Sequence, residues 1–286
     1  MKNILIYWFL QLNKIFPKKH HPFHDLKNGI HDINYTDFEY SHTSELLKMY
    51  KDFYDFSELK WKKILEIWCG WWWKAIYISE HYDCSAVGID LNLNFLSQAG
   101  NKAQEKWVED NVKFVAMSAL EMDFNENEFD LVLMSDVLEH IPETEKLLKE
   151  VHRVTKTWWI ILFDFAPYYH YFGHHLWDTI QIPWLHLFTT EKFRIDLYKE
   201  SLKWLPDADK RIDLRVWFNE LGKESFTYLN RITRKQFENI ISECEEKWFF
   251  KKCTISYFML KNISILSKIP FLREVWIRHI VWSLKK

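Results

Sequence analysis

Between residues 62 and 165, short apolar runs alternate with longer segments in which apolar residues recur every three or four positions. The short runs predict five β-strands, at 63–67, 85–90, 112–115, 129–134 and 160–165. The longer segments predict helices at 74–81, 92–106 and 143–154. Strands that alternate with helices of this length predict an α/β fold with a doubly wound, mainly parallel sheet.

The segments on either side follow other patterns. Residues 1–60 predict a helical N-terminal extension, because 1–16 has helical apolar spacing. Residues 166–230 are rich in aromatic residues and histidine, and they predict a cap, with one helix at 190–205, inserted after the fifth strand. A helix at 233–247, a strand near 249–258 and a last apolar stretch at 274–284 follow. We therefore expect an extension, 1–60, and a domain, 61–286, that includes the cap.

Composition and charge narrow the class of protein. The 286 residues are 48% hydrophobic and 27% charged, which is typical of a soluble globular protein. The net charge of -2 gives no support for a nucleic-acid partner. The four cysteines form no CxxC pair, so we expect them to be reduced and the protein to be cytoplasmic. No apolar run approaches the roughly 18 residues of a transmembrane helix.

Glycine and tryptophan usage is unusual. Glycine at about 7% would give roughly 20 residues in this length. The chain has 6 glycines and 16 tryptophans, which together come close to that number. A systematic exchange of tryptophan for glycine would produce this composition.

The turn after the first strand shows the same anomaly. Glu66 ends the strand, and the run Trp68-Cys69-Gly70-Trp71-Trp72-Trp73 follows. A nucleotide-binding α/β protein needs glycine in this turn, because a residue without Cβ permits both the backbone conformation and the close approach to the ligand. Tryptophan occupies most of these positions.

The segment 62–165 resembles the class I S-adenosylmethionine-dependent methyltransferases of the small-molecule (type 11) branch. The first motif of that family is an acid followed by Gly-x-Gly-x-Gly. In this chain the acid is Glu66, and the glycine positions are Trp68, Gly70 and Trp72. The resemblance implies a Rossmann-like methyltransferase fold and S-adenosyl-L-methionine as cofactor.

Three further motifs support the resemblance. The acid that holds the ribose hydroxyls in the family corresponds to Asp90, whose alternative role is to cap the next helix. The segment 129–140, which ends Asp-Val-Leu-Glu-His, matches the fourth motif of the family nearly residue for residue. Where the family often has Asp-Ala near the adenine, this chain has Ser118-Ala119. The resemblance implies cofactor binding by Glu66, Trp68, Cys69, Gly70, Trp72, Asp90, Leu91, Ser118, Ala119, Ser135 and Asp136.

Histidines are the candidates for acid–base chemistry, because their pKa lies near neutral pH. His140 follows the fourth strand, where the family places residues on the substrate side. His175 and His186 fit a pattern of related sequences, Gly-His-Leu followed by Ile-Pro-Trp-x-His. We expect no metal, since no cysteine or carboxylate spacing supports a closed zinc site. The alternative for each histidine is a structural place inside an aromatic cap.

Seven tryptophans stand where the resemblance expects glycine: Trp61, Trp68, Trp72, Trp107, Trp158, Trp159 and Trp248. Some bacteria decode UGA as glycine, whereas common alternative genetic codes decode it as tryptophan. We hypothesise that these residues are glycine in the natural protein, whereas Trp184 resembles a genuine family tryptophan. The alternative is a degenerate relative that does not bind the cofactor.

The sequence therefore predicts a methyltransferase that acts by in-line displacement on a small or lipid-like acceptor. One alternative is an NAD(P)-dependent oxidoreductase, because glycine at Trp68 and Trp73 around Gly70 would give Gly-x-Gly-x-x-Gly. Another is a non-catalytic binding or scaffold protein. We expect no nucleic-acid partner and a monomer or homodimer. Basic amphipathic segments at both ends of the chain offer peripheral contact with the inner face of a membrane as an alternative to simple packing.

Overall fold

The computed structural model describes residues 2–17, 33–68, 74–226, 228–248, 252–259, 274–275 and 277–286. The chain forms two compact units. The sheet unit comprises 36–165, 235–258 and 279–286, and the cap unit comprises 1–35, 166–234 and 259–278. No helix in the described ranges is long and apolar enough to cross a bilayer.

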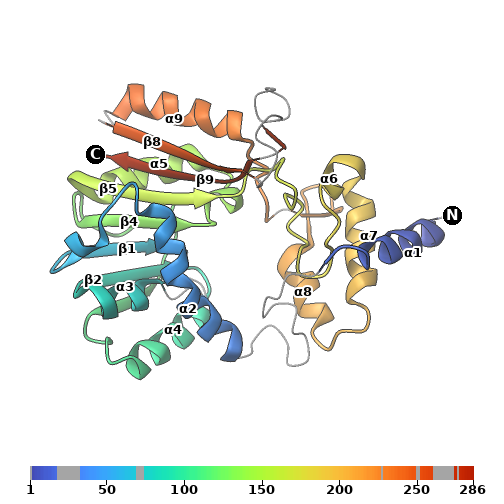
Figure 1. Cartoon of the computed structure of the whole chain (residues 1–286), viewed down its shortest axis with the longest axis horizontal. Helices are drawn as coiled ribbons and strands as arrows, with labels where there is room; N and C mark the ends of the chain where they lie inside the picture. The colour runs from blue at the N-terminus through green and yellow to red at the C-terminus, as the bar shows by residue number, and fades with distance from the viewer. Residues whose placement is uncertain are drawn as a thin grey trace. The chain divides into compact units, whose positions relative to one another are not determined.

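The sheet unit is built on seven strands in the order β3-β2-β1-β4-β5-β9-β8 (Figure 1). The strands β1 to β5 pair in parallel, whereas β9 runs antiparallel to β5. This order confirms the predicted doubly wound fold. The strands are β1 (Lys63–Ile67), β2 (Ser85–Asp90), β3 (Val112–Ala116), β4 (Phe129–Ser135), β5 (Thr155–Phe165), β8 (Lys252–Met259) and β9 (Ile277–Lys285).

Helices flank this sheet, and their apolar faces complete its core. Leu46, Leu47 and Tyr50 of α2 pack into the same cluster as the β1 residue Ile64 and the α3 residue Ile76. The helices are α2 (Ile33–Tyr50), α3 (Lys74–Tyr82), α4 (Leu93–Glu105), α5 (Thr144–Val154) and α9 (Arg234–Trp248), with the short 3-10 helices η2 (Phe56–Leu59) and η3 (Leu138–His140). The end of the predicted N-terminal extension therefore contributes to the core of the sheet unit.

The strand β5 begins earlier than the sequence pattern predicts. It starts at Thr155 rather than at residue 160, and its pairing with β4 shifts between Phe129 and Leu131. The extra residues include Trp158, whose φ is +72°. The sequence pattern missed this start, because residues 155–159 lack the continuous apolar run of a buried strand.

The cap unit is mainly helical. Asn13 of α1 donates from Nδ2 to the carbonyl of Thr179 (2.8 Å) and accepts from the backbone N–H of Gln181 (2.6 Å), which fastens α1 to the loop before α6. The predicted cap helix is α7, capped by Thr190, and α8 is an additional helix that the sequence pattern did not show. The elements are α1 (Lys2–Asn13), α6 (Leu185–Phe188), α7 (Glu191–Leu202), α8 (Ala208–Arg215), β6 (Trp217–Phe218) and β7 (Glu224–Ser225).

Candidate cofactor site

The carboxyl ends of three neighbouring strands define one edge of the sheet. Ile67 of β1 pairs with Ile89 of β2 and with Met134 of β4, so these strands end at the same level. Ligands of open α/β sheets bind outside this edge, where neighbouring connections run to opposite faces. The predicted cofactor residues Glu66, Asp90 and Ser135 all lie in the last two positions of these strands.

Glu66 is buried at the end of β1 and caps the helix that follows. Its Oε2 accepts from the backbone N–H of Ala75 (2.8 Å), and its Oε1 lies 3.6 Å from Nζ of Lys74. Burial raises the pKa of Glu66 to about 7, although Lys74 and the Ala75 hydrogen bond oppose the shift. Among the described residues, Oε1 has no hydrogen-bond partner. A cationic or N–H donor from a ligand would satisfy it.

Asp90 ends β2 with a buried carboxylate. Its Oδ1 accepts from the backbone N–H of Asn92 (2.8 Å), and the side chain of Asn92 caps α4. The residue that caps α4 is therefore Asn92, while the Asp90 carboxylate accepts the backbone N–H of that cap residue. The next residue, Leu91, is 76% exposed. A buried carboxylate followed by an exposed apolar residue suits the ribose diol and the face of a nucleoside.

The loop after β3 lies beside Asp90. The backbone N–H of Met117 donates to the Asp90 carbonyl (3.1 Å), which brings Ser118 and Ala119 to the same edge of the sheet. The Ser118 hydroxyl accepts from the N–H of Leu120 (3.2 Å) and so shapes the turn. The predicted adenine-side residues therefore adjoin the predicted ribose-side acid.

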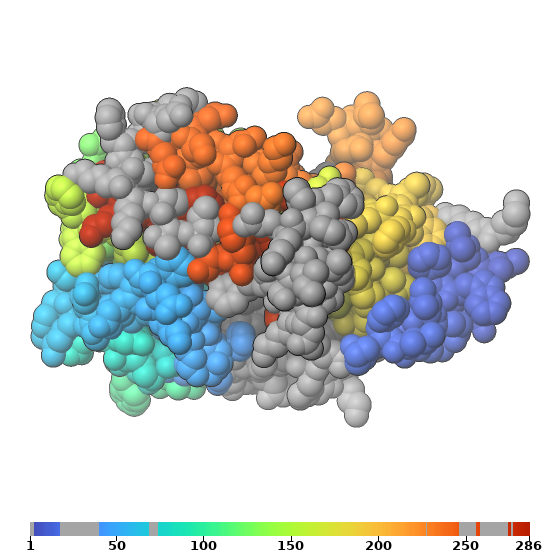
Figure 2. Space-filling view, turned by 45° about the horizontal axis from the view of Figure 1, so that its top comes forward, coloured from blue at the N-terminus to red at the C-terminus, as the bar shows by residue number. Residues whose placement is uncertain are grey.

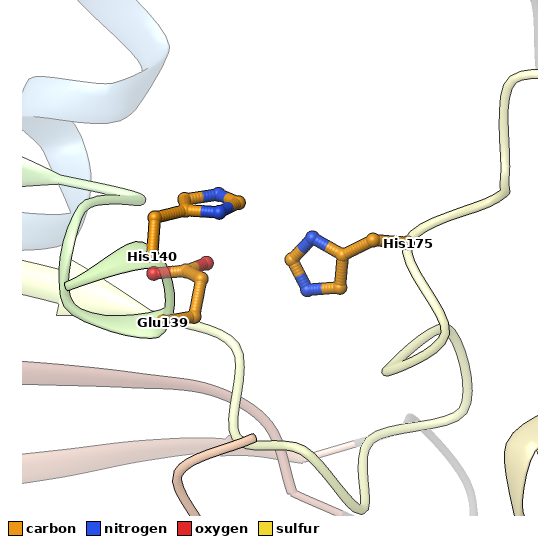
Figure 3. Close-up of side chains that lie close together, drawn as sticks. All are labelled: Glu139, His140 and His175. Atoms are coloured by element: carbon orange, nitrogen blue, oxygen red, sulfur yellow. The ribbon is translucent and has the colours of Figure 1, made fainter. Parts of the chain in front are cut away.

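The connection after β4 carries the fourth motif. Ser135 is buried, and Asp136 has a φ of +52° and donates its backbone N–H to the carbonyl of Asp164 (3.0 Å). The motif ends in η3, where Glu139 is buried and His140 is half-buried (Figure 3). The His140 ring meets the Trp68 ring edge-on at 4.6 Å, so the turn after β1 and the fourth motif are in contact.

The other two predicted catalytic histidines belong to the cap unit. His175 lies on a loop with a φ of +52° (Figure 3). His186 is buried in α6, and burial together with the nearby charge of Arg194 lowers its pKa to about 4. Its ring lies 5.9 Å from that of His174, which is also buried. His186 therefore has the surroundings of a structural histidine, the alternative that the sequence left open.

Several tryptophans have a backbone conformation that is unusual for a bulky residue. Ten described non-glycine residues have positive φ, and five of them are tryptophan. A bulky residue in this left-handed region is an outlier, whereas glycine enters it freely. The five are Trp61 (+63°), Trp68 (+58°), Trp107 (+59°), Trp158 (+72°) and Trp184 (+54°).

Four of these five positions are ones where glycine is expected. Trp61 and Trp107 are more than 80% exposed. Trp184 differs, because its ring is half-buried and its Nε1 donates to the Val275 carbonyl (3.3 Å). Two further tryptophans stand at positions where glycine is expected: Trp159 lies in β5, and Trp248 ends α9. The turn residues Cys69, Gly70 and Trp72 lie outside the described residues.

The sequence did not identify a polar group at the same edge that joins Tyr50 of α2, Asp164 of β5 and His279 of β9. The Tyr50 hydroxyl and the His279 ring both hydrogen-bond to the Asp164 carboxylate. The only signal in the sequence was an aspartate in an otherwise apolar strand. Such an aspartate predicts hydrogen-bond partners, because a buried acid needs them. Its partners are 114 and 115 residues away, so only the tertiary structure shows them.

Comparison with known proteins agrees with this geometry. Residues 65–158 match the family model of a methyltransferase domain. The chain is 30% identical over 105 residues to norajmaline N-methyltransferase of Rauvolfia serpentina, covering 37% of this chain and 36% of that protein. It is 32% identical over 99 residues to demethylmenaquinone methyltransferase of Geobacillus stearothermophilus, covering 34% of this chain and 42% of that protein. The chain thus spans well under half the length of these curated relatives.

A solved structure shows the same fold over a longer range. An S-adenosylmethionine-dependent methyltransferase from Mesorhizobium loti aligns with a TM-score of 0.51 at 12% identity, covering 84% of this chain and 96% of that one. The match to the family model includes Glu66, Asp90 and the fourth motif, the residues that meet at the carboxyl edge of the sheet. Residues 65–158 therefore match a methyltransferase domain, and the fold is that of an S-adenosylmethionine-dependent methyltransferase.

Proposed function

We propose that this protein transfers a methyl group from S-adenosylmethionine to a small or lipid-like acceptor. The observation that carries the proposal is the pair of buried carboxylates, Glu66 and Asp90, at the ends of adjacent parallel strands. Glu66 Oε1 lies 3.6 Å from Nζ of Lys74 and has no hydrogen-bond partner among the described residues. Two acids placed this way fit the ammonium end and the ribose diol of the cofactor.

Each residue then has a distinct part in binding. Asp90 accepts hydrogen bonds from the ribose hydroxyls, a role suited to a carboxylate with two oxygens. Glu66 faces the amino-acid end, and Ser118 and Ala119 border the adenine. Asp136 and His140 face the acceptor. The bound cofactor supplies a methyl group on a positively charged sulfur, which leaves as a neutral thioether. The main task of the protein is to hold the acceptor atom in line with that methyl group.

The class of acceptor follows from the relatives and from the surface of the cap unit. The relatives named above act, by their names, on a nitrogen of norajmaline and on demethylmenaquinone. The cap unit exposes large apolar side chains along α1, including Ile4, Leu5 and Trp8 (blue in Figure 2). An apolar surface of this kind fits a lipid-like acceptor and peripheral contact with a membrane.

The tryptophans at glycine positions decide whether the printed sequence can bind the cofactor. We propose glycine at 61, 68, 72, 107, 158, 159 and 248 in the natural protein, and we call the full-length chain with these seven replacements the glycine chain. The left-handed φ of Trp61, Trp68, Trp107 and Trp158 supports this proposal. TGG codons in the gene at positions 68, 72, 158 and 159 would contradict it.

Isothermal titration calorimetry with S-adenosylmethionine tests the proposed function. We expect micromolar binding by the glycine chain, and at least tenfold weaker binding by its Asp90→Asn variant, because the charge-assisted hydrogen bonds to the ribose are lost. No heat at millimolar ligand would overturn the proposal. Binding of NADH in place of S-adenosylmethionine would favour the oxidoreductase alternative.

Label transfer completes the test. The glycine chain is incubated with methyl-tritiated S-adenosylmethionine and an extract of bacterial metabolites and lipids. We expect tritium in an extract component, and organic partition of the label would indicate a lipid-like acceptor. Binding without transfer would favour the non-catalytic alternative.

A further inference from the structure

The polar group at Asp164 lies in the interior of the sheet unit. Asp164 is fully buried, and both of its carboxylate oxygens are engaged: Oδ1 by the hydroxyl of Tyr50 and Oδ2 by Nε2 of His279. Tyr50 is also fully buried, whereas the His279 side chain is 17% exposed. The chain of hydrogen bonds therefore runs from the interior to a ring that reaches the surface of the unit.

Strand register places this ring at the carboxyl edge of the sheet. Phe165, the last residue of β5, pairs with Ile280 of β9, so His279 lies just beyond the end of β5. Asp136, which follows β4, donates its N–H to the Asp164 carbonyl. One side-chain oxygen or nitrogen from each of Asp136, Asp164 and His279 lies within 4.8 Å of the others. The group is thus beside the segment that faces the acceptor in the proposed function.

The charges around Asp164 favour its ionised form. Burial alone would raise the pKa of Asp164, but the charge and hydrogen bond of His279, together with the hydroxyl of Tyr50 and the charge of Lys74, hold it below its ordinary value. Burial raises the pKa of Tyr50, so this residue stays a hydrogen-bond donor. A buried carboxylate that holds one ring nitrogen sets the tautomer and stabilises the protonated imidazole, as in other carboxylate–histidine pairs.

We propose that His279, oriented by Asp164 and Tyr50, accepts the proton of the methyl acceptor. This proposal rests on the proposed function and deepens it, since it favours an acceptor with an O–H or N–H group. His279 would be the catalytic base, and Asp164 and Tyr50 would be positioning residues.

The step balances without a further reactant. The acceptor oxygen or nitrogen forms a bond to the methyl carbon while the carbon–sulfur bond breaks and its electron pair stays on sulfur. The proton of the acceptor passes to the His279 ring, and the resulting imidazolium faces the Asp164 carboxylate. Deprotonation by water returns the ring to its neutral form. The proton of the acceptor is not kept in either product, so each turnover releases one proton to the solvent.

His186, one of the histidines that the sequence suggested, is less suited to this role by its surroundings. It is buried, with a pKa lowered to about 4, so it would be a weak base at neutral pH. His279 differs from it, because a fully buried carboxylate orients the ring. The titratable groups that face it are Asp164, Tyr50 and Asp136, with Lys74 acting on Asp164.

The test measures tritium transfer by the glycine chain to the metabolite and lipid extract between pH 5 and 9. We expect His279→Gln to lower the rate by about 100-fold, the range of a lost general base, while calorimetric affinity for S-adenosylmethionine stays within about twofold. The acid limb of the pH profile should disappear. We expect Asp164→Asn to shift that limb to lower pH, because the imidazolium loses its neighbouring negative charge. The control is His81→Gln, on the exposed side of α3.

The outcomes separate this inference from the function on which it rests. Absence of label transfer by the glycine chain overturns the proposed function and this inference together. Transfer that persists in His279→Gln with an unchanged pH profile overturns the inference alone. So does activity that is lost with EDTA and restored by a divalent cation, since Asp136, Asp164 and His279 would then act as metal ligands.

A second measurement covers the case in which Asp164→Asn does not fold. NMR spectra of the glycine chain with ¹⁵N-labelled histidine measure the titration of each imidazole ring. The His279 signal is the one that is missing from the spectrum of His279→Gln. We expect the His279 ring to remain protonated to higher pH than free histidine in the same buffer. Loss of the His279 proton at a lower pH than that of free histidine would overturn the inference.

Discussion

The two units differ most in what they expose. Of the 20 exposed large apolar side chains among the described residues, 14 belong to the cap unit. In the sheet unit the exposed ones are Leu91 and Leu93, beside Asp90, and the four left-handed tryptophans. Both units bury ions: Arg211 of the cap unit is 1% exposed and lies 3.0 Å from both Asp178 and Asp207, and the Glu66–Lys74 pair of the sheet unit is buried as well.

This contrast indicates a division of roles. The sheet unit exposes few large apolar side chains, and those that are not tryptophan lie beside Asp90, the acid proposed to bind the ribose. The cap unit holds its helices together with charged pairs and leaves apolar side chains on its surface, where a lipid-like acceptor or a membrane can meet them. Most exposed large apolar side chains of the sheet unit are tryptophans at positions where glycine is expected. The difference in apolar exposure between the two units should therefore grow when glycine is restored.

The largest expected effect concerns the buried ions of the cap unit. Arg211→Met should lower the free energy of unfolding by about 3–5 kcal/mol, because the buried carboxylates of Asp178 and Asp207 would lose this guanidinium, although Asp178 would keep Arg215 at 3.6 Å. Urea unfolding followed by circular dichroism measures the change. Lys48→Met, which removes the exposed Lys48–Glu45 pair of α2, is the control and should change stability by less than about 0.5 kcal/mol. Equal effects of the two variants would show that the buried ions of the cap unit contribute no more to stability than an exposed pair.

The next effect concerns Glu66 in the sheet unit. Its pKa is raised from 4.5 to about 7, so the folded state holds the proton more tightly than the unfolded state. Stability should therefore fall as the pH rises from about 4.5 to 7, by on the order of 2 kcal/mol. Glu66→Gln, which stays neutral, should lack this loss and be the more stable protein at pH 8 but not at pH 4.5. Urea midpoints at these pH values measure the difference, and a constant difference would contradict the expectation.

A smaller effect is expected at the surface of α1. Replacing Ile4 and Trp8 with serine should weaken binding to anionic liposomes roughly tenfold, because the apolar area that enters the bilayer is lost. Co-sedimentation measures binding, and the melting temperature should stay unchanged because both side chains are exposed. The matched control is Trp204→Ser, also in the cap unit and 86% exposed. Liposome binding equal to that of the unaltered chain would argue against α1 as the membrane contact.

The smallest effect distinguishes the tryptophans themselves. Trp107→Gly should stabilise the protein by about 0.5–1 kcal/mol, since glycine relieves the strain of a φ of +59° but also frees the unfolded chain. Trp204→Gly is the control: it is exposed to the same extent, without a left-handed backbone, and should destabilise by a similar amount. Thermal unfolding measures both. Two changes of the same sign would show that Trp107 is not strained.

The regular part of the fold could be predicted from the sequence. The strands β1, β2 and β4 and the helices α3 to α5 lie where the apolar periodicity placed them, within one or two residues. That periodicity reflects burial on both faces of a parallel sheet, which is a local property of each segment. The cap unit was less predictable. Its helix α8 has a mostly charged sequence whose burial depends on Arg211 and its distant partners.

The candidate site divides in the same way. Glu66, Asp90 and Asp136 could be named because each directly follows or ends a strand, and the ends of parallel strands meet at one edge. Tyr50 and His279 could not be named from the sequence, because no motif in α2 or β9 indicates a functional role for either residue. Their shared partner, Asp164, joins them only when β9 pairs antiparallel with β5.

By itself, the sequence determined the order of most strands and helices, the positions of the acids proposed to bind the cofactor and the anomaly at the glycine positions. These features are local, because periodicity, strand ends and turn chemistry extend over a few residues. The tertiary structure decided which tryptophans have a left-handed backbone, which histidines are buried, and which histidine faces a carboxylate. The last of these depends on contacts between residues 114 and 115 positions apart, and no local pattern encodes them.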